Sequence, residues 1–441
     1  MSHSTSKHTP RRHSRREFLK TSAGAVSAAA LANVAIERTA HAAGSDILKV
    51  GLIGCGGRGS GAGLQALNAD NGARLVAMAD VFEDRLKGAR QRLAGQKGEQ
   101  VAVADDQCFA GLDGGLKVIQ SGVDVVLIAC ASRYHPEYLQ AAVEAGKHVF
   151  VEKPHAIDPP GVRTVMAACE LAAKKNLNVV SGLCYRYDPG MRETMKRIFD
   201  GAIGEIVAIQ ETYMRSPYRL IEREPGQKEL EYQYRNWYHF RWLSGDDVPQ
   251  SLLHSIDKGA WALRDEIPEK AFGLGGRSSS VGTVFGDVFD HASIVFEYAN
   301  GVRMYAHGRA QNGCYNEVSD VFLGTKGRCY LMKKQIEGQT NWKYEGPKSN
   351  MYDVEHQELF ASIRAGKPIN NGLYMARSTM MAVLGQMAVY SGKQITWEDA
   401  MKSQYIAGPG PAQCSWDMDP PVKPDANGIY PVPIPGMMKL S

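Results

Sequence analysis

Short apolar runs alternate with helical patterns along residues 47–183. Residues 123–129 (VDVVLIA) are almost continuously apolar, which is typical of a strand buried on both faces of a parallel sheet. Further strands are predicted at 47–53, 74–80, 147–154 and 178–183. Helical patterns separate them, for example at 135–146 and 160–175. Because strands and helices alternate, the pattern predicts a doubly wound α/β domain.

A glycine-rich segment joins the first predicted strand to the helix after it. It reads G-x-G-x-x-G at Gly54, Gly56 and Gly59, and the second strand ends at Asp80, 21 residues after Gly59. In this context the motif predicts a dinucleotide site, the alternative being an ordinary glycine turn in another α/β protein. The loop and the helix N-terminus would bind the pyrophosphate. Asp80 would accept hydrogen bonds from the ribose hydroxyls and repel a 2′-phosphate, which favours NAD over NADP.

Residues 1–42 have the pattern of an export signal. Arg15 and Arg16 in SRREFLK precede an alanine-rich stretch, and the AHA at 40–42 offers a small-x-small cleavage site. The paired arginines resemble the twin-arginine signal of bacteria, which carries folded proteins across the membrane. An ordinary secretory signal or a basic terminus without an address is the alternative. We therefore expect a periplasmic or otherwise exported protein that meets the membrane only during export.

The charge of the chain is concentrated in this segment. Residues 1–42 hold seven Lys/Arg and two Asp/Glu, a net of +5, and the whole chain is +4, so the rest is about −1. No basic footprint for nucleic acid remains. The eight cysteines are scattered without a C-x-x-C pair, so neither a zinc site nor a disulfide framework is predicted, and no metal is expected.

Longer motifs lie in and after the predicted α/β domain. They are IACASRYH (128–135), AGKHVFVEKP (145–154), GLCYRYDPGM (182–191), YHFRWLSGDDVPQSLLHSIDKGAWAL (238–263) and YDVEHQELFASIRAGKPINNGLYMARST (352–379). Together they resemble the Gfo/Idh/MocA family of sugar and polyol oxidoreductases, which includes glucose–fructose oxidoreductase and inositol dehydrogenase. The resemblance covers nearly all of residues 47–403.

The resemblance implies an NAD-binding Rossmann domain over residues 43–183. A second, α+β domain over 184–406 would be built on an open, largely antiparallel sheet, on which family members commonly form homo-oligomers. The strand-like runs EIVAIQETY, ASIVFEY and VRMYAHG agree with such a sheet. The proline-rich residues 407–441 predict an extended arm or a disordered end.

The resemblance also assigns the chemistry. Lys153 would donate a hydrogen bond to the reacting oxygen, and His254 would be the general acid/base on the substrate hydroxyl. The pattern places Gln250, His254 and Asp257 on one face of a helix that begins near Pro249. Gln250 departs from the family, because the dehydrogenases often have an acid there. An amide cannot carry a proton charge, which puts simple dehydrogenase activity in doubt.

Further site residues are expected around these two. The predicted cofactor site comprises Gly54, Gly56, Arg58, Gly59, Asp80, Ser132, His135, Glu152, Lys153 and Arg186. The predicted substrate site comprises Tyr185, Arg235, Trp237, Gln250 and Asp257, with Tyr234 and Tyr238 as further candidates. The aromatic stretch 231–242 suits carbohydrate rings and, equally, an oligomer interface.

The predicted function is that of an exported NAD-dependent oxidoreductase of a sugar, polyol or sugar derivative. The periplasm supplies no free NAD, so the protein would load its cofactor before export and regenerate it in place. One alternative is a redox-neutral glycoside hydrolase that oxidises a ring hydroxyl, eliminates the substituent, adds water and returns the hydride. A non-catalytic sugar-binding protein is a second alternative, against which the retained Lys153 and His254 argue.

Overall fold

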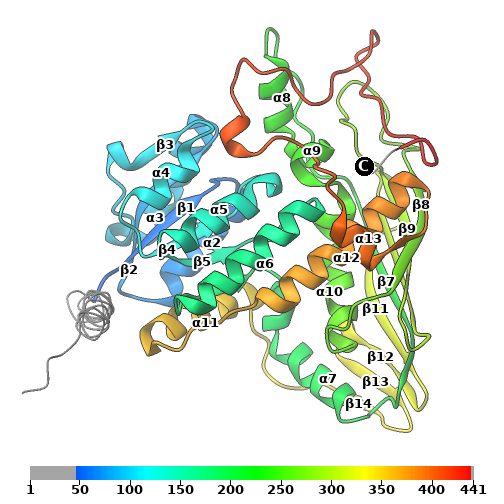
Figure 1. The fold of residues 1–441 in the computed structure, drawn as a ribbon. Coiled ribbons are helices and arrows are strands. Elements are labelled where there is room, and N and C mark those ends of the chain that lie inside the picture. The colour runs from blue at the N-terminus through cyan, green and yellow to red at the C-terminus, as the bar shows by residue number, and fades with distance from the viewer. Residues whose placement is uncertain (1–45, 439–441) are drawn as a thin grey trace, which may run out of the picture. The chain divides into compact units, whose positions relative to one another are not determined.

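The computed structural model describes residues 46–438, and the predicted export signal lies outside them. The first part of the fold is a six-stranded parallel sheet, sheet A, with strand order β3-β2-β1-β4-β5-β6 (Figure 1). This order is that of the doubly wound dinucleotide-binding fold. Its strands are β1 (Leu48–Ile53), β2 (Ala73–Asp80), β3 (Cys108–Ala110), β4 (Val125–Ile128), β5 (His148–Val151) and β6 (Val179–Ser181). The predicted Rossmann fold is confirmed.

Helices flank this sheet because its strands are apolar on both faces. Every residue of β4 is buried, as the continuous apolar run predicts. The helices of this part are α2 (Gly57–Ala69), α3 (Glu83–Lys97), α4 (Gly114–Gln120), α5 (His135–Glu144) and α6 (Pro159–Lys174). The short helical turns are η1 (Gly98–Gln100), η2 (Asp105–Gln107), η3 (Ser132–Tyr134) and η4 (Cys184–Tyr187).

The second part is a nine-stranded sheet, sheet B, in the order β14-β13-β12-β11-β7-β10-β9-β8-β15. Only the β7–β10 pair of this sheet is parallel, so the predicted largely antiparallel sheet is confirmed. The strands are β7 (Ile206–Arg215), β8 (Lys270–Gly276), β9 (His291–Glu297), β10 (Arg303–Ala310), β11 (Glu317–Gly324), β12 (Gly327–Tyr330), β13 (Gln335–Gly338), β14 (Trp342–Lys343) and β15 (Ile395–Thr396).

One face of sheet B is covered by helices. Alternate residues of β9 are buried, and the almost wholly buried α12 packs against β8 and β9. The helices of this part are α7 (Pro189–Phe199), α8 (Glu229–Arg235), α9 (Arg241–Ser244), α10 (Leu253–Ala262), α11 (Met351–Ala365), α12 (Gly372–Ser391) and α13 (Trp397–Lys402). The turns are η5 (Trp237–His239), the π-helical η6 (Val248–Leu252), η7 (Leu331–Lys333) and η8 (Pro411–Gln413).

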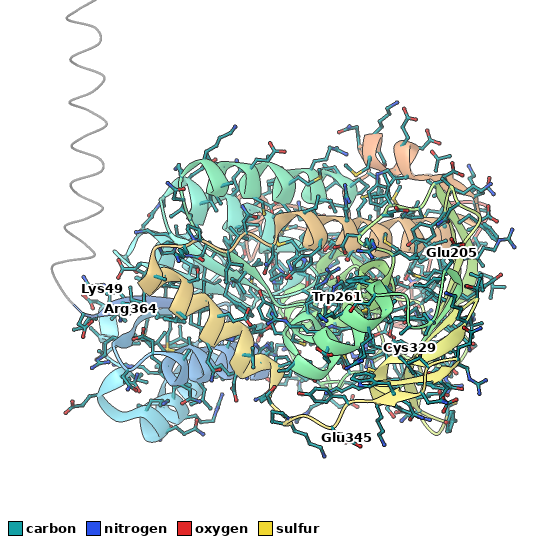
Figure 2. The ribbon with its side chains drawn as sticks, turned by 90° about the horizontal axis from the view of Figure 1, so that it is seen from below. Lys49, Glu205, Trp261, Cys329, Glu345 and Arg364 are labelled. Atoms are coloured by element: carbon teal, nitrogen blue, oxygen red, sulfur yellow. The ribbon has the colours of Figure 1, made fainter. Side chains whose placement is uncertain are left out.

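The chain returns to sheet A after β14, before it adds β15 to the edge of sheet B. Helix α11 packs against α2, and Arg364 near its end, labelled in Figure 2, donates to Asp70 at the end of α2 with Nε 2.8 Å from Oδ2. The backbone N–H of Val179 in β6 donates to the carbonyl of Ile369 at 2.9 Å. The second half of the sequence therefore helps to build the Rossmann part, which the predicted boundary at residue 183 does not anticipate.

The proline-rich segment 407–438 runs extended over the surface of both parts. Between residues 414 and 424 every second side chain is partly buried and those between are exposed. This two-residue period is that of an extended chain with one face on the protein. Tyr430, further along, is completely buried.

Residues 46–438 contain neither a membrane-spanning helix nor a metal-binding cluster. No helix there combines the length and the apolar character that crossing a membrane requires. No group of three or more His, Cys, Asp or Glu side chains in this part of the chain is placed to hold a metal ion.

Candidate active site

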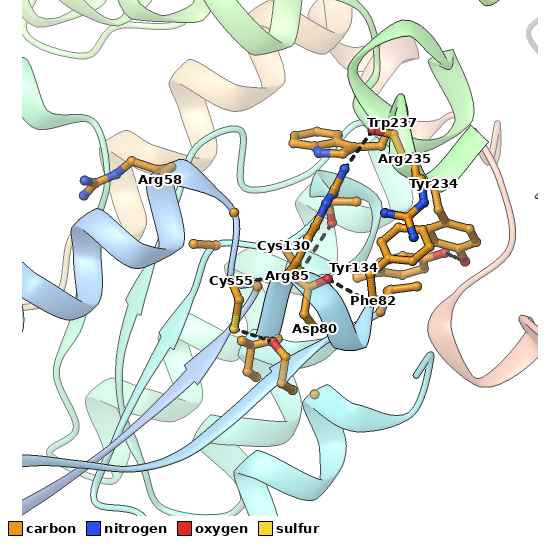
Figure 3. Close-up of a pocket in the computed structure, with 18 of the residues that line it drawn as sticks. Cys55, Arg58, Asp80, Phe82, Arg85, Cys130, Tyr134, Tyr234, Arg235 and Trp237 are labelled. Atoms are coloured by element: carbon orange, nitrogen blue, oxygen red, sulfur yellow. Dashed lines mark hydrogen bonds between the residues drawn. The ribbon is translucent and has the colours of Figure 1, made fainter. Parts of the chain in front are cut away.

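A cavity of about 610 Å³ lies over the carboxyl ends of β1, β2 and β4 (Figure 3). We call the floor those lining residues that come from the Rossmann part, between Ile53 and Tyr138. We call the roof the remaining lining residues, which come from three distant segments. They are Tyr218, Arg219, Ile221, Tyr234, Arg235, Trp237, Tyr238, Pro411 and Cys414.

The three glycines of the G-x-G-x-x-G loop have different tasks. Gly54 has a φ of +94°, and a Cβ on it would lie 2.5 Å from the carbonyl oxygen of Ala129. A Cβ on Gly59 would lie 1.8 Å from the carbonyl oxygen of Gly54. A Cβ on Gly56, in contrast, would meet no atom within 4 Å. Gly54 and Gly59 therefore permit the turn, and Gly56 keeps space open beside the N-terminus of α2, where a pyrophosphate fits.

Asp80 is fixed at the end of β2 by two backbone donors. Its Oδ2 accepts from the N–H of Cys55 at 2.7 Å, and its Oδ1 accepts from the N–H of Phe82 at 2.9 Å. Burial raises the pKa of Asp80 above its ordinary value, while these two N–H groups oppose the rise. Each oxygen keeps a second lone pair, so the carboxyl group can also accept from a ribose hydroxyl.

Arg58 is part of the glycine loop, but its side chain turns away from the Asp80 end (Figure 3). Its guanidinium pairs with Glu152 and also with Glu355 of α11, at 3.2 Å from Nη2 to Oε1. Burial raises the pKa of Glu355 well above its ordinary value, and the nearby charge of Glu152 raises it further. These ion pairs connect the glycine loop to α11 and to the Glu152-Lys153-Pro154 segment after β5. The side chains of Arg58 and Glu152, both predicted at the cofactor, thus bind each other in this structure.

Lys153 follows β5 at the same edge of sheet A. Its Nζ donates to the backbone carbonyl of Gln250 at 2.6 Å, which connects the Rossmann part to the segment before α10. His135 lies behind this turn, with Nδ1 2.8 Å from the carbonyl oxygen of Pro154 and Nε2 3.0 Å from that of Cys130. We therefore assign His135 to holding the Lys153–Pro154 turn.

His254 lies in the first turn of α10 among aromatic rings. The ring of Tyr185 meets it edge-on at 5.3 Å, and that of Tyr213 stacks at 6.4 Å, both between centroids. Burial lowers the pKa of His254 well below its ordinary value, and the charge of Lys153 lowers it further. The imidazole is therefore neutral at neutral pH. No described residue bonds its buried Nδ1.

A buried charged cluster lies next to this histidine. Lys258, one turn further along α10, places Nζ 2.5 Å from Asp320 Oδ2 and 4.3 Å from the centre of the Tyr185 ring. Glu211 is the partner of Asp320 in the β7–β11 ladder. Burial, with Asp320 close by, raises the pKa of Glu211 well above its ordinary value. When Glu211 is protonated and neutral, the charges that remain in this cluster are those of the Lys258–Asp320 ion pair. The charge of Lys258 also lowers the pKa of His254.

The structure gives Gln250 and Asp257 other partners than a substrate. The predicted first turn of the helix is the π-helical η6, and Gln250 Nε2 donates to Ser132 Oγ at 2.9 Å and to the carbonyl of Ser244 at 2.6 Å. Asp257 Oδ1 accepts from Arg186 Nη2 at 2.8 Å. Arg186, predicted at the cofactor, is buried and bonded to Asp265 as well. These side chains hold the site in place.

The roof is mostly aromatic. Trp237 stacks on Tyr238, and Tyr238 on Tyr218, with centroids 3.8 Å apart in both pairs. Arg215 lies over the free face of Tyr218, 3.6 Å from its centroid. Arg235 lies elsewhere, 4.0 Å over the ring of Phe82 near Asp80. That end of the cavity is the nucleotide end, so the position of Arg235 favours contact with the cofactor over the predicted contact with the substrate.

Two groups of residues separate in this structure. Gly54, Gly56, Asp80, Arg58, Arg235, Trp237, Tyr234 and Tyr238 line the cavity, whereas Gly59 is buried in α2 and does not line it. Lys153 and His254 do not line the cavity. Arg58 does line it, and its charge is close enough to lower the pKa of His254. The cavity is also lined by residues that the sequence did not indicate as site residues, among them Phe82, Arg85, Tyr218, Pro411 and Cys414. Only the alternation after Cys414 could have indicated that the tail packs.

The Rossmann part matches a known protein family. Residues 48–182 match the model of the Gfo/Idh/MocA oxidoreductase family, described as having an NAD-binding Rossmann fold. The chain carries the NAD-binding domain of the Gfo/Idh/MocA oxidoreductases. The glycine loop, the open space at Gly56 and the carboxyl group of Asp80 fit that cofactor.

Three curated relatives of this chain illustrate the range of the similarity. A glycosyl hydrolase family 109 protein of Shewanella amazonensis is 30% identical over 259 residues, which are 55% of this chain and 54% of that protein. Inositol 2-dehydrogenase of Klebsiella pneumoniae (strain 342) is 34% identical over 50% of this chain and 55% of its own. Inositol 2-dehydrogenase of Salmonella typhimurium is 25% identical over 73% and 87%, respectively. The chain thus spans about half the length of the first two.

Solved structures share the fold of this chain. A levoglucosan dehydrogenase in complex with NADH and levoglucosan aligns with a TM-score of 0.62 at 18% identity, covering 79% of this chain and 99% of that one. An aldose–aldose oxidoreductase from Caulobacter crescentus complexed with glycerol aligns with a TM-score of 0.61, also at 18% identity and with the same coverage. The arrangement of both sheets is therefore that of this group of structures.

Proposed function

We propose that this chain is an exported NAD-dependent oxidoreductase that oxidises a hydroxyl group of a sugar, polyol or sugar derivative by hydride transfer. The observation that carries the proposal is the contact of Lys153 with the segment before α10, which brings Lys153 and His254 to the edge of sheet A where the cavity lies. In a doubly wound sheet this edge is where ligands bind. Relatives named as inositol 2-dehydrogenases support the substrate class.

The two residues have complementary tasks. The ammonium group of Lys153 donates a hydrogen bond to the substrate oxygen and stabilises the alkoxide character that develops as the C–H bond breaks. The neutral imidazole of His254 accepts the hydroxyl proton. NAD, when bound, supplies the acceptor for the hydride. The aromatic rings of Tyr185 and Tyr213 exclude water around the imidazole.

A redox-neutral glycosidase is the second candidate. The C–H next to a transiently oxidised carbon is acidic, so the glycosidic substituent can leave, water can add, and the hydride can return to the same carbon. Two observations favour it. One is the relative named as a glycosyl hydrolase family 109 protein. The other is Gln250, whose amide donates to Ser132 and Ser244 and cannot act as an acid or base in a simple dehydrogenase.

Turnover in deuterated water without added NAD separates the two candidates. A panel of free sugars, polyols and glycosides is given to the purified protein, and the products are analysed by mass spectrometry and NMR. The oxidoreductase gives one equivalent of oxidised product for each bound NAD, or paired oxidised and reduced products where a second sugar reoxidises the cofactor, and no deuterium at the neighbouring carbon. Elimination and rehydration instead release the aglycone or a free sugar with deuterium at that carbon. Neither product from any member of the panel would argue for the non-catalytic sugar-binding alternative.

Export and assembly complete the proposal. The SRREFLK segment supports transport of the folded, cofactor-loaded protein by the twin-arginine pathway to the periplasm. Exposed apolar side chains on sheet B, such as Val207 and Leu274, support a homo-oligomer. A reporter fused to the signal and sedimentation of the mature protein test these two points.

A further inference from the structure

The lining of the dinucleotide cavity includes residues from the far end of the chain. Pro411 and Cys414 line it together with the glycine loop, although more than 300 positions separate them in sequence. Both residues lie outside residues 48–182, which match the family model. In Figure 1 the orange-red turn η8 lies beside the Rossmann helices, and the chain then passes α8.

The proline-rich segment 407–438 is attached to the Rossmann part near Asp80, at the nucleotide end of the cavity. Arg133 Nε donates to the carbonyl of Gly408 at 2.8 Å. The hydroxyl of Tyr134 lies 3.3 Å from Cys414 Sγ. Trp416 packs against Phe82, with ring centroids 6.2 Å apart, and Phe82 is two residues beyond Asp80. These contacts place the segment where the adenosine half of a dinucleotide fits.

The same segment is also attached to the roof and to sheet B. Trp416 meets the ring of Tyr234 edge-on at 5.7 Å. Gln233 Nε2 donates to the carbonyl of Val422 at 2.8 Å. Tyr430 is buried against Phe240, with centroids 5.0 Å apart, and its carbonyl accepts from Arg277 Nη2 at 2.9 Å. The segment is therefore held on both sides of the cavity.

We propose that residues 408–418 are part of the cofactor site: they wall the adenosine half and must separate from Phe82 and Tyr234 before the nucleotide can leave. Pro411 and the neighbouring rings of Tyr134 and Tyr234 offer apolar surface to an adenine. The thiol of Cys414 offers a weak polar contact. Dissociation of the nucleotide then includes the cost of undocking Trp416. The proposal rests on the NAD-binding domain and goes beyond the sugar chemistry, because it explains how an exported enzyme keeps its cofactor.

The first test measures nucleotide release and does not depend on turnover. Wild-type protein loaded with NADH is mixed with excess NAD, and the loss of bound-nicotinamide fluorescence gives the release rate. We expect release from Trp416→Ala to be about 10-fold faster, the factor that corresponds to about 1.4 kcal/mol. Met437→Ala is the matched control, because Met437 is in the same tail but 74% exposed, and its release rate should equal that of the wild type. Equal rates for Trp416→Ala and wild type would overturn the proposal.

The second test uses the unaltered protein, in case Trp416→Ala does not fold. Cys414 is partly buried beside the cavity, whereas Cys314 is exposed. Alkylation of each thiol is followed by mass spectrometry with and without NAD. Bound NAD should slow the labelling of Cys414 several-fold and leave that of Cys314 unchanged. Equal labelling of Cys414 in both states would overturn the proposal, whereas a protein that protects Cys414 but turns over no sugar would contradict only the proposed function.

Discussion

The floor and the roof of the cavity are built in opposite ways. The floor is mostly backbone geometry from one continuous part of the chain: a turn that tolerates no Cβ at Gly54 or Gly59, a helix N-terminus and a carboxyl group at the end of β2. The roof is side chains from three distant segments, stacked ring on ring. The floor can recognise what all dinucleotides share, whereas the roof can differ from one relative to the next. Recognition of the cofactor and its retention are thus separate properties of this molecule.

The largest expected effect is a change in the backbone of the floor. Gly59→Ala places a Cβ 1.8 Å from the carbonyl oxygen of Gly54, so the turn must open and both the stability and the NAD affinity should be lost. Gly56→Ala is the matched control, because its Cβ meets no atom. It should keep the wild-type Tm and lose only affinity, since the methyl group occupies the space of the pyrophosphate. Thermal unfolding and NAD titration measure both, and equal behaviour of the two variants would contradict this account of the loop.

The next effect concerns the catalytic edge of the floor. Lys153→Met removes the hydrogen bond to the developing alkoxide, and kcat should fall by about 100-fold to 1000-fold. The bound nucleotide should remain, because the glycine loop and Asp80 are unchanged. Single-turnover reduction of the nicotinamide provides the rate, and nucleotide content provides the control. Near wild-type kcat on the true substrate would remove Lys153 from the mechanism.

A smaller effect concerns the pH dependence of the stability of the Rossmann part. Burial lowers the pKa values of His155 and His356 to about 3. His155 lies against Ser181 of β6 on one face of sheet A, and His356 lies against Phe150 of β5 on the other face. Each is neutral in the folded protein, and in the unfolded chain it gains a proton below about pH 6.5. Stability is therefore present above pH 6.5 and lost as pH falls. Each histidine should lower the free energy of unfolding by about 2 kcal/mol between pH 6.5 and 5. Asp246, whose pKa burial raises to about 7, acts in the opposite sense over this range. Urea titrations of the wild type and of His356→Gln at the two pH values therefore isolate one histidine, and an equal pH dependence of the two proteins would contradict the prediction.

The glycine loop and five of the six strands of sheet A could be predicted from sequence because they depend on local patterns. Continuous apolar runs indicate buried parallel strands, and three glycines at fixed spacing indicate the turn. Strand β3 has only three residues, Cys108–Ala110, which is too short for a periodicity to appear. Partners that are distant in sequence were beyond reach. The amide of Gln250 and the carboxylate of Asp257 bind neighbours that no spacing reveals, and the contacts of the tail depend on where its partners fold.

The central claim is that a sugar C–H gives its hydride to NAD held on this floor. The most direct measurement uses a substrate found in the panel, deuterated at the carbon that bears the reacting hydroxyl, and the NAD that the protein carries through purification. After one turnover the nucleotide is released by acid-free denaturation and examined by mass spectrometry and NMR. We predict deuterium at C4 of the nicotinamide in the wild type, and almost none with Lys153→Met incubated for the same time. Product formed by the wild type with no deuterium at any time on the nicotinamide would contradict the account.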